Sequence, residues 1–342
     1  MSERPFGLVL AGSGETIARS YDEMLNQPVD QEMYSASGQK PRRYQTTVRR
    51  PVSIEGPGTF LGRAKRTLCF EPSEEEGWWL DRVDLPDSLP IRVAISNVWT
   101  TARNIVLCSG SPHNYVRMVE HIVALKTGMG LDNVVIRLQS GDPPLFDRSS
   151  MDLVESIEKT ELKDLSAPAR WFTVREPVSV GRGNGSFLVF LPLEAGATPK
   201  LTIDCAINFE SAIGKQRIIF DVDPTTFRHG ALARTNTTLG MMIYSRTVGK
   251  LFADIRNLGY TVNNIMIAGR KKYLNEPRMI HDDKSLEAVW HRATLDLLAA
   301  VALIEHGRFA GRILSYKAGH SLDVLMIKRL YQNKLLVPVE CK

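Results

Sequence analysis

Residues 47–54 read Thr-Val-Arg-Arg-Pro-Val-Ser-Ile, and a closely similar segment, Thr-Val-Arg-Glu-Pro-Val-Ser-Val, follows at residues 173–180. The two segments are offset by 126 residues, and seven of their eight positions match or change within one class of side chain. Each is followed by glycines and by another run of β-branched or aromatic residues, the pattern of a β-hairpin. Two unrelated edge strands could share so short a pattern, but the repeat favours a domain that occurs twice in the chain.

The expected elements follow the same order in both halves, with strands first and helical periodicity later. In the first half, apolar residues at helical spacing predict a helix over residues 115–126, and a strand follows at residues 133–138. In the second half, helices are expected at residues 250–258 and 286–305. This order is typical of α+β proteins. We therefore expect two similar two-layer α/β sandwich domains, each with a mainly antiparallel sheet packed on helices.

The duplication sets the predicted domain limits. Residues 43–164 form the first domain and residues 165–335 the second, with residues 336–342 as a C-terminal tail. Residues 1–42 are poor in periodic hydrophobic residues and are expected to be a partly disordered extension. Its Gly12-Ser13-Gly14 motif lacks the third glycine and the βαβ pattern of a phosphate-binding loop, so a turn is predicted there.

The composition excludes several classes of protein. With 43% hydrophobic and 24% charged residues, the chain has the make-up of an ordinary globular protein, and its net charge of +5 gives no reason to expect a nucleic-acid partner. Only the basic stretch 42–50 would support a nucleic-acid binder, the weakest of the possible readings. The scattered cysteines, the short N-terminal apolar run and the lack of an 18-residue apolar run predict a cytoplasmic protein without a membrane span.

Glu120 and His121 are the first candidates for chemistry. They lie between Val119 and Ile122 on the predicted helix. A carboxylate and an imidazole flanked by core residues are costly to bury unless something pairs with them. A zinc-ligating histidine beside a general base would explain the pairing, and so would an ordinary pair on a helix surface.

His291 and Asp296 add a second imidazole and a carboxylate on a later helix. Together with His121 they make a possible His/His/Asp site with the open fourth position that hydrolytic zinc needs. Five steps along an α-helix advance about 500°, so the side chains of His291 and Asp296 would point about 140° apart. Joint ligation therefore requires a π-bulge or a local unwinding between them. Otherwise His291 caps a helix and Asp296 is an unrelated carboxylate.

From about residue 44 to residue 330, the chain resembles the zinc-dependent UDP-3-O-acyl-N-acetylglucosamine deacetylases of lipid A biosynthesis. No single block carries the resemblance, but the order and spacing of the blocks together do. The blocks are Arg50-Pro51-Val52-Ser53 with Gly56, Val119-Glu120-His121, Gly130-Leu131-Asp132-Asn133, Pro144-Leu145-Phe146-Asp147, Ala212-Ile213-Gly214-Lys215-Gln216-Arg217 with Phe220-Asp221, Ala233-Arg234-Thr235, Leu274-Asn275-Glu276 and Tyr316-Lys317-Ala318-Gly319-His320.

The resemblance implies a fold, a reaction and a set of roles. The family fold is two similar α+β domains with the active site between them. The implied reaction is zinc-dependent removal of an acetyl group from an acylated UDP-sugar, a small-molecule partner. The implied roles are His121, His291 and Asp296 as zinc ligands, Glu120 as the base that deprotonates water, His320 as the group that stabilises the oxyanion or protonates the amine, and Thr235, Arg292 and Lys317 as substrate contacts.

The chain also departs from the family pattern. The ligand spacing is one residue longer, and Ala299-Ala300 stands where the family has a carboxylate that supports the catalytic histidine. Two hypotheses follow: an active zinc deacetylase, or a catalytically impaired or re-purposed homologue that binds a nucleotide sugar, an acyl chain or a protein partner. The other departures are Thr59-Phe60-Leu61-Gly62 without a histidine, Arg148 for glycine, Asn236 for an aromatic residue and Arg292 for lysine.

Overall fold

The computed structural model describes residues 5–36, 41–58, 64–102, 104–238, 240 and 261–340. The main sheet of the first half has five strands in the order β4-β5-β11-β6-β7. Only β11 and β6 run parallel, and the other neighbours are antiparallel. The strands are β4 (Val52–Pro57), β5 (Lys65–Pro72), β6 (Trp78–Arg82), β7 (Ile91–Arg92) and β11 (Val134–Leu138), and the helices of this half are α2 (Glu120–Gly128) and α3 (Met151–Thr160).

The second half repeats this sheet as β14-β15-β23-β16-β17. Again only one pair, β23 and β16, is parallel, and it occupies the same place in the order. The strands are β14 (Val178–Gly181), β15 (Phe187–Leu191), β16 (Leu201–Asn208), β17 (Lys215–Asp221) and β23 (Gly311–Tyr316). The helices are α4 (Pro224–Gly230), α7 (Glu287–His291), α8 (Leu298–Val301) and α9 (His320–Gln332), with a π-helical turn, Arg292–Leu297, between α7 and α8.

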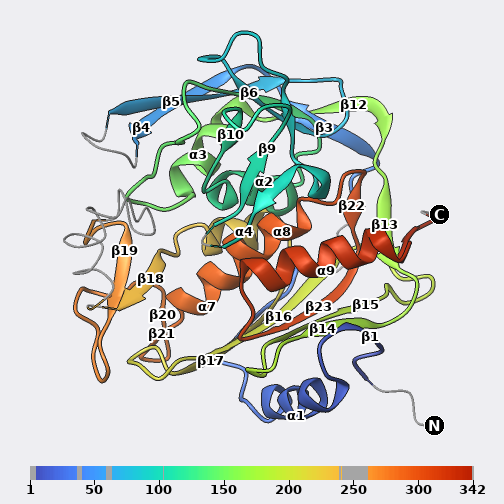
Figure 1. The fold of residues 1–342 in the computed structure, drawn as a ribbon, viewed down its shortest axis with the longest axis vertical. Coiled ribbons are helices and arrows are strands. Elements are labelled where there is room, and N and C mark those ends of the chain that lie inside the picture. Colours follow the sequence, from blue (N-terminus) through green and yellow to red (C-terminus); the bar gives the residue numbers. More distant parts are fainter. Residues whose placement is uncertain are drawn as a thin grey trace.

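The identical strand order and direction confirm the predicted pair of similar α+β units. The two repeated segments of the sequence fall at equivalent places, because residues 47–54 join β3 (Tyr44–Val48) to β4 and residues 173–180 join β13 (Trp171–Val174) to β14. The two main sheets lie on the outside, and the helices of both halves face each other in the middle (Figure 1). One apolar core, with buried side chains from both halves, fills this space.

Shorter strands complete the described fold. They form five small sheets and are accompanied by a 3-10 turn, Ile95–Asn97. The sheets are β3 with β12 (Leu162–Pro168); β8 (Val98–Thr100), β9 (Val106–Cys108) and β10 (Tyr115–Val116); β13 with β22 (Arg308–Phe309) and β24 (Leu336–Pro338); β18 (Thr235–Thr238) with β19 (Ile265–Ala268); and β20 (Ile280–His281) with β21 (Lys284–Ser285).

The N-terminal stretch differs from the expected, partly disordered extension. Residues 8–33 form β1 (Leu8–Ala11), α1 (Gly14–Leu25) and β2 (Gln31–Met33). β1 pairs with β14 and β2 with β17, so this segment adds one parallel strand to each edge of the second main sheet. α1 crosses the outer face of that sheet and buries Ile17 and Met24 against it (Figure 1). The edge-strand pairing of β1 and β2 and the burial of Ile17 and Met24 hold the segment on this sheet.

The predicted turn at Gly12 has a steric reason. Gly12 has a φ of 90° and sits so close to the backbone of Gly181 that a Cβ atom would lie 2.4 Å from its carbonyl oxygen. Ser13 then caps α1, with its hydroxyl accepting a hydrogen bond from the backbone N–H of Thr16. Glycine is the residue that tolerates both this backbone conformation and this contact.

Several helix, strand and domain limits in the structure differ from those predicted from the sequence. The helix expected from residue 115 begins at Glu120, because residues 115–116 pair with β9 as β10. The strand at 133–138 is β11, and the helix at 286–305 corresponds to α7, the π-helical turn and α8. The helix expected at 250–258 lies outside the described residues. The proposed limit between residues 164 and 165 falls inside β12, and the proposed tail contributes β24.

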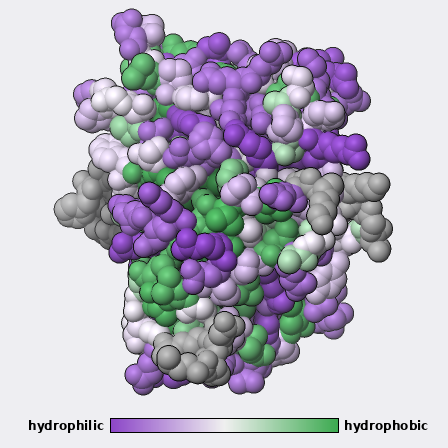
Figure 2. Space-filling view, turned by 90° about the vertical axis from the view of Figure 1, so that its right-hand side faces the viewer, coloured by the Kyte–Doolittle hydropathy of each residue, from purple (hydrophilic) through white to green (hydrophobic). Residues whose placement is uncertain are grey.

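One face of the molecule carries both hydrophilic and apolar regions. On the face shown in Figure 2, hydrophilic side chains dominate the upper part and apolar side chains gather around the middle. No helix among the described residues has the length and the apolar composition needed to cross a membrane.

Candidate active site between the two halves

The first half supplies Glu120 and His121 from the start of α2. The Glu120 side chain is 4% exposed, and its carboxylate accepts a hydrogen bond from the backbone N–H of Ile105. The His121 ring faces the second half, where its centre lies 5.5 Å from the ring centre of His291. The two residues are therefore at the interface between the halves and are not an ordinary pair on a helix surface.

The second half supplies His291 and Asp296, and the helix between them has the irregularity that their spacing requires. Residues 292–297 form a π-helical turn, whose hydrogen bonds join residue i to residue i+5. His291 and Asp296 consequently lie one turn apart, with Nδ1 of His291 3.7 Å from Oδ1 of Asp296. The extra residue in the sequence is absorbed by the wider turn.

His320 joins this cluster from the first position of α9. Its Nε2 atom lies 3.7 Å from Oε1 of Glu120 and 3.7 Å from Oδ1 of Asp296. Burial works to lower the pKa of His320, but the carboxylates of Asp296 and Glu120 outweigh it and raise that pKa. Burial raises the pKa of Glu120, and the charge of His320 only partly offsets this effect.

The three predicted zinc ligands have the charge states that metal ligation needs. Burial lowers the pKa of His121 to about 3, and the neighbouring His291 adds to the shift. Burial also lowers the pKa of His291. For Asp296, burial works to raise the pKa, but His320 and His291 outweigh it, so the pKa is lowered. At neutral pH the two imidazoles are neutral and the carboxylate is an anion.

Each predicted histidine ligand has a hydroxyl partner on one ring nitrogen. Nε2 of His291 lies 2.7 Å from Oγ1 of Thr235, and Nδ1 of His121 lies 3.4 Å and 3.5 Å from the hydroxyls of Ser149 and Ser150. Metal-bound histidines commonly have such a partner on the nitrogen away from the metal, which fixes the ring. Thr235 is thus placed against His291, and the two serines are site residues that the motifs did not reveal.

Arg292 and Lys317, the other predicted substrate contacts, are engaged with the protein itself. Arg292 is 6% exposed, and its guanidinium donates to Oδ1 of Asp323 at 2.5 Å. Nζ of Lys317 lies 3.7 Å from Oε2 of Glu23 on α1. Their roles toward a substrate remain predictions.

The departures from the family pattern also have places in the structure. Ala299 and Ala300 of α8 are buried in the apolar core, and the Arg148 guanidinium donates to the carboxylate of Glu155 at 2.7 and 2.9 Å. Asn236 lies in β18. The segment Thr59-Phe60-Leu61-Gly62 lies outside the described residues.

The donor atoms of the site suit zinc better than their present distances do. As they stand, no three His, Cys, Asp or Glu side chains in the described part of the chain converge closely enough to hold a metal ion. Two ligands of a tetrahedral zinc ion lie about 3.4 Å apart, since each is about 2.1 Å from the metal. The 3.7 Å between His291 and Asp296 is near this value. The donor types and charge states fit zinc.

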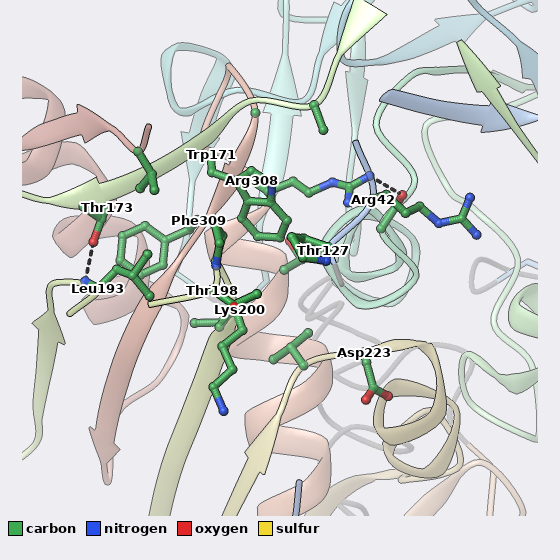
Figure 3. A pocket seen from close by; sticks show the side chains of 18 of the residues that line it. Arg42, Thr127, Trp171, Thr173, Leu193, Thr198, Lys200, Asp223, Arg308 and Phe309 are labelled. Carbon is green, nitrogen blue, oxygen red and sulfur yellow. Dashed lines mark hydrogen bonds between the residues drawn. The ribbon is translucent and has the colours of Figure 1, made fainter. Parts of the chain in front are cut away.

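An open groove lies elsewhere on the described surface. It has a volume of about 1580 Å³ and is lined by Thr127, Trp171, Phe309 and other residues, but by none of the site residues above (Figure 3). Three of its cationic side chains are paired with carboxylates of the protein: Arg308 with Asp132, Lys200 with Asp221 and Arg42 with Asp164.

A model of the family "UDP-3-O-acyl N-acetylglycosamine deacetylase" matches residues 45–332. The chain belongs to this deacetylase family. UDP-3-O-acyl-N-acetylglucosamine deacetylases of Brucella ovis, Brucella abortus and Brucella melitensis are each 27% identical to it over 293 residues, which is 85% of this chain and 96% of theirs. The family match contains every predicted site residue and begins after β1, α1 and β2.

Proposed function

We propose that this member of the deacetylase family is a zinc-dependent enzyme that removes the acetyl group from an acylated UDP-sugar, in the cytoplasm. The π-helical turn is the observation that supports the proposal best. It compensates for the extra residue between His291 and Asp296, and a chain that had lost its metal site would have no use for this compensation. His121, His291 and Asp296 would hold the zinc ion.

Zinc would polarise the amide carbonyl as a Lewis acid. Glu120 would take the proton of the attacking water. Its carboxylate is buried beside the metal ligands, and its raised pKa makes it a stronger base than an exposed glutamate. The backbone N–H of Ile105 fixes the position of the carboxylate.

His320 would supply the proton that the departing amine needs. The two carboxylates 3.7 Å from its Nε2 atom raise the pKa of the ring and so favour its protonated form. His320 begins α9 and Glu120 begins α2, so the proposed acid and the proposed base come from different helices and lie 3.7 Å apart. Thr235 would accept a hydrogen bond from Nε2 of His291 and leave Nδ1 for the metal.

A catalytically impaired homologue that still binds a nucleotide sugar is the second candidate. Two observations favour it: Ala300 provides no carboxylate where the family has one, and the three candidate ligands do not converge as they stand. This candidate predicts binding of the sugar nucleotide without turnover.

The test uses the purified full chain, UDP-3-O-acyl-N-acetylglucosamine as substrate and acetate release as the readout. We expect about one zinc ion per chain, loss of turnover on chelation and recovery when zinc is added back. His291→Ala should lose both zinc and turnover. His229→Ala is the matched control, because that histidine packs on Trp290 outside the cluster and should leave both unchanged. Substrate binding by a zinc-free, inactive wild-type chain would support the second candidate instead.

A further inference from the structure

A second buried acid lies at the start of α9, beyond the site residues named above. Asp323 follows His320 by three residues, which places both side chains on one face of the helix. It is 1% exposed, and its Oδ1 atom accepts a hydrogen bond from Arg292 at 2.5 Å. The face that carries His320 and Asp323 is therefore turned toward the π-helical turn.

His320 and Asp323 each leave one polar atom unsatisfied. Nδ1 of His320 and Oδ2 of Asp323 are buried, and neither has a hydrogen-bond partner among the described residues. An unpartnered buried polar group costs about 1–3 kcal/mol. A potential donor and an acceptor one helical turn apart can satisfy each other through a side-chain rotation or one bridging water. The opposite edge of the His320 ring, with Nε2, faces Glu120 and Asp296.

Arg292 holds Asp323 in place from the other side. Its Nε atom donates to the carbonyl oxygen of Ala318 at 2.9 Å, and its NH2 group donates to the hydroxyl of Ser315 at 3.3 Å as well as to Asp323. One rigid guanidinium thus connects the π-helical turn, the end of β23 and the loop that leads into α9. Because Arg292 directly follows His291, the same turn that presents a candidate ligand also fixes the surroundings of His320.

We propose that Asp323, held by Arg292, is the positioning residue of His320. Its Oδ2 atom accepts a hydrogen bond from Nδ1–H, directly or through one water, and this bond keeps Nε2 directed at the substrate amide. The inference rests on the proposed function, since it concerns the residue that protonates the leaving amine. Without Asp323 the ring can rotate, or can carry its proton on the wrong nitrogen for the next cycle.

The test is a double-mutant cycle with Asp323→Asn and His320→Ala in the zinc-loaded full chain. Asp323→Asn should lower kcat by about 10- to 100-fold and leave KM within about twofold. In the His320→Ala background the same substitution should change kcat by less than about twofold, because the group that it positions is gone. An equal loss in both backgrounds would mean a merely structural ion pair and would overturn the proposal.

Asp204→Asn is the matched control for the loss of a buried carboxylate. Asp204 is fully buried in the same half and pairs with Arg217 at 2.9 Å and with Arg312 at 2.7 Å, away from the site. Its substitution should lower the melting temperature and leave kcat unchanged. A loss of kcat as large as that of Asp323→Asn would show that any broken buried pair has this effect, and would also overturn the proposal.

A measurement that needs no turnover separates this inference from the proposed function. In nitrogen-15 NMR of the histidine rings at a pH where His320 is neutral, the wild type should show the Nδ1–H tautomer. In Asp323→Asn, Arg292 holds the amide oxygen and the amide NH2 faces the ring, so the Nε2–H tautomer should appear. If the tautomer differs between the wild type and Asp323→Asn but the wild type is inactive, only the proposed function is refuted. If the tautomer is the same in both proteins, the positioning role is refuted.

Discussion

The two halves share one arrangement of strands but differ in what covers the outer face of the sheet. In the first half, β11 alternates between buried residues and the more exposed Val135 and Arg137, and the outer face meets solvent. In the second half, β15 is buried from Phe187 to Phe190, and its Phe187 and Val189 lie in one apolar cluster with Ile17 and Met24 of α1, which covers the outside. A covered sheet face needs apolar residues at successive positions, whereas an open face needs alternation. The N-terminal segment and the apolar strands of the second half therefore depend on each other.

The halves also use the same helix position for different purposes. α2 and α7 each begin with a buried glutamate, Glu120 and Glu287. Glu287 receives the guanidinium of Arg234 at 2.6 and 3.0 Å, and also the backbone N–H groups of Arg234 and Arg278. Glu120 has no arginine or lysine partner among the described residues and faces His320 instead. A carboxylate held by a guanidinium is fixed as an anion, so only Glu120 is suited to accept and release a proton.

The largest expected effect tests this contrast between the two glutamates. Glu120→Gln should lower kcat by about 10²- to 10⁴-fold, because the general base is lost while the shape of the side chain is kept. Zinc content should remain at that of the wild type. Acetate release and metal analysis of the same samples measure both.

Glu287→Gln is the control for that experiment. It breaks a buried ion pair and should cost about 3–5 kcal/mol of the free energy of unfolding, measured by urea denaturation, while kcat stays within about threefold of the wild type. If Glu287→Gln stopped turnover and Glu120→Gln did not, the roles assigned to the two helices would be reversed.

The duplication of the fold and part of the site could be predicted from the sequence, because short motifs carry them. The segment around Pro51 and its copy around Pro177 indicated two similar units. Joint ligation by His291 and Asp296 was expected to need a π-bulge or a local unwinding, and the structure contains a π-helical turn there. Asp323 could have been found too, since it is three residues from His320 on a helix. The hydroxyl partners of the histidines could not, because Thr235 and Ser149 reach them only through the packing of separate elements.

The folding of the N-terminal segment could not be predicted from its own sequence, for another physical reason. Its apolar residues are few, and whether they fold depends on a surface formed by strands more than 150 residues later, such as β15 and β23. Local periodicity contains no information about that surface. The expectation of partial disorder failed for this reason, and not because the segment has unusual residues.

A second, smaller effect should distinguish the covered sheet face from the open one. Ile17 of α1 is 1% exposed and packs against the outer face of the second main sheet. Ile17→Ala should lower the free energy of unfolding by about 2–5 kcal/mol. Val135→Ala, at a half-buried position on the outer face of the first sheet, should cost less than about 1 kcal/mol. Equal losses in urea denaturation would show that α1 is only loosely attached.

The smallest expected effect is a change in the pH dependence of stability, at a contact of Lys126 between the two halves. Lys126 of α2 donates from Nζ to the carbonyl oxygens of Ala302 at 2.7 Å and Ile304 at 2.8 Å, both in the second half. Burial lowers the pKa of Lys126 from 10.5 to about 8. Between these two values the unfolded chain binds more protons than the folded one, so the contribution of Lys126 to stability rises with pH.

Lys126→Met isolates this contribution, because all other titrating groups are common to both proteins. From pH 7.5 to pH 9, the free energy of unfolding of the wild type should rise by about 1 kcal/mol relative to that of Lys126→Met. Urea denaturation of both proteins at the two pH values measures the difference. Parallel pH profiles would mean that the two carbonyl oxygens keep the ammonium charged throughout this range. The halves would then be joined by a charged link, and the pKa of Lys126 would lie above the range tested.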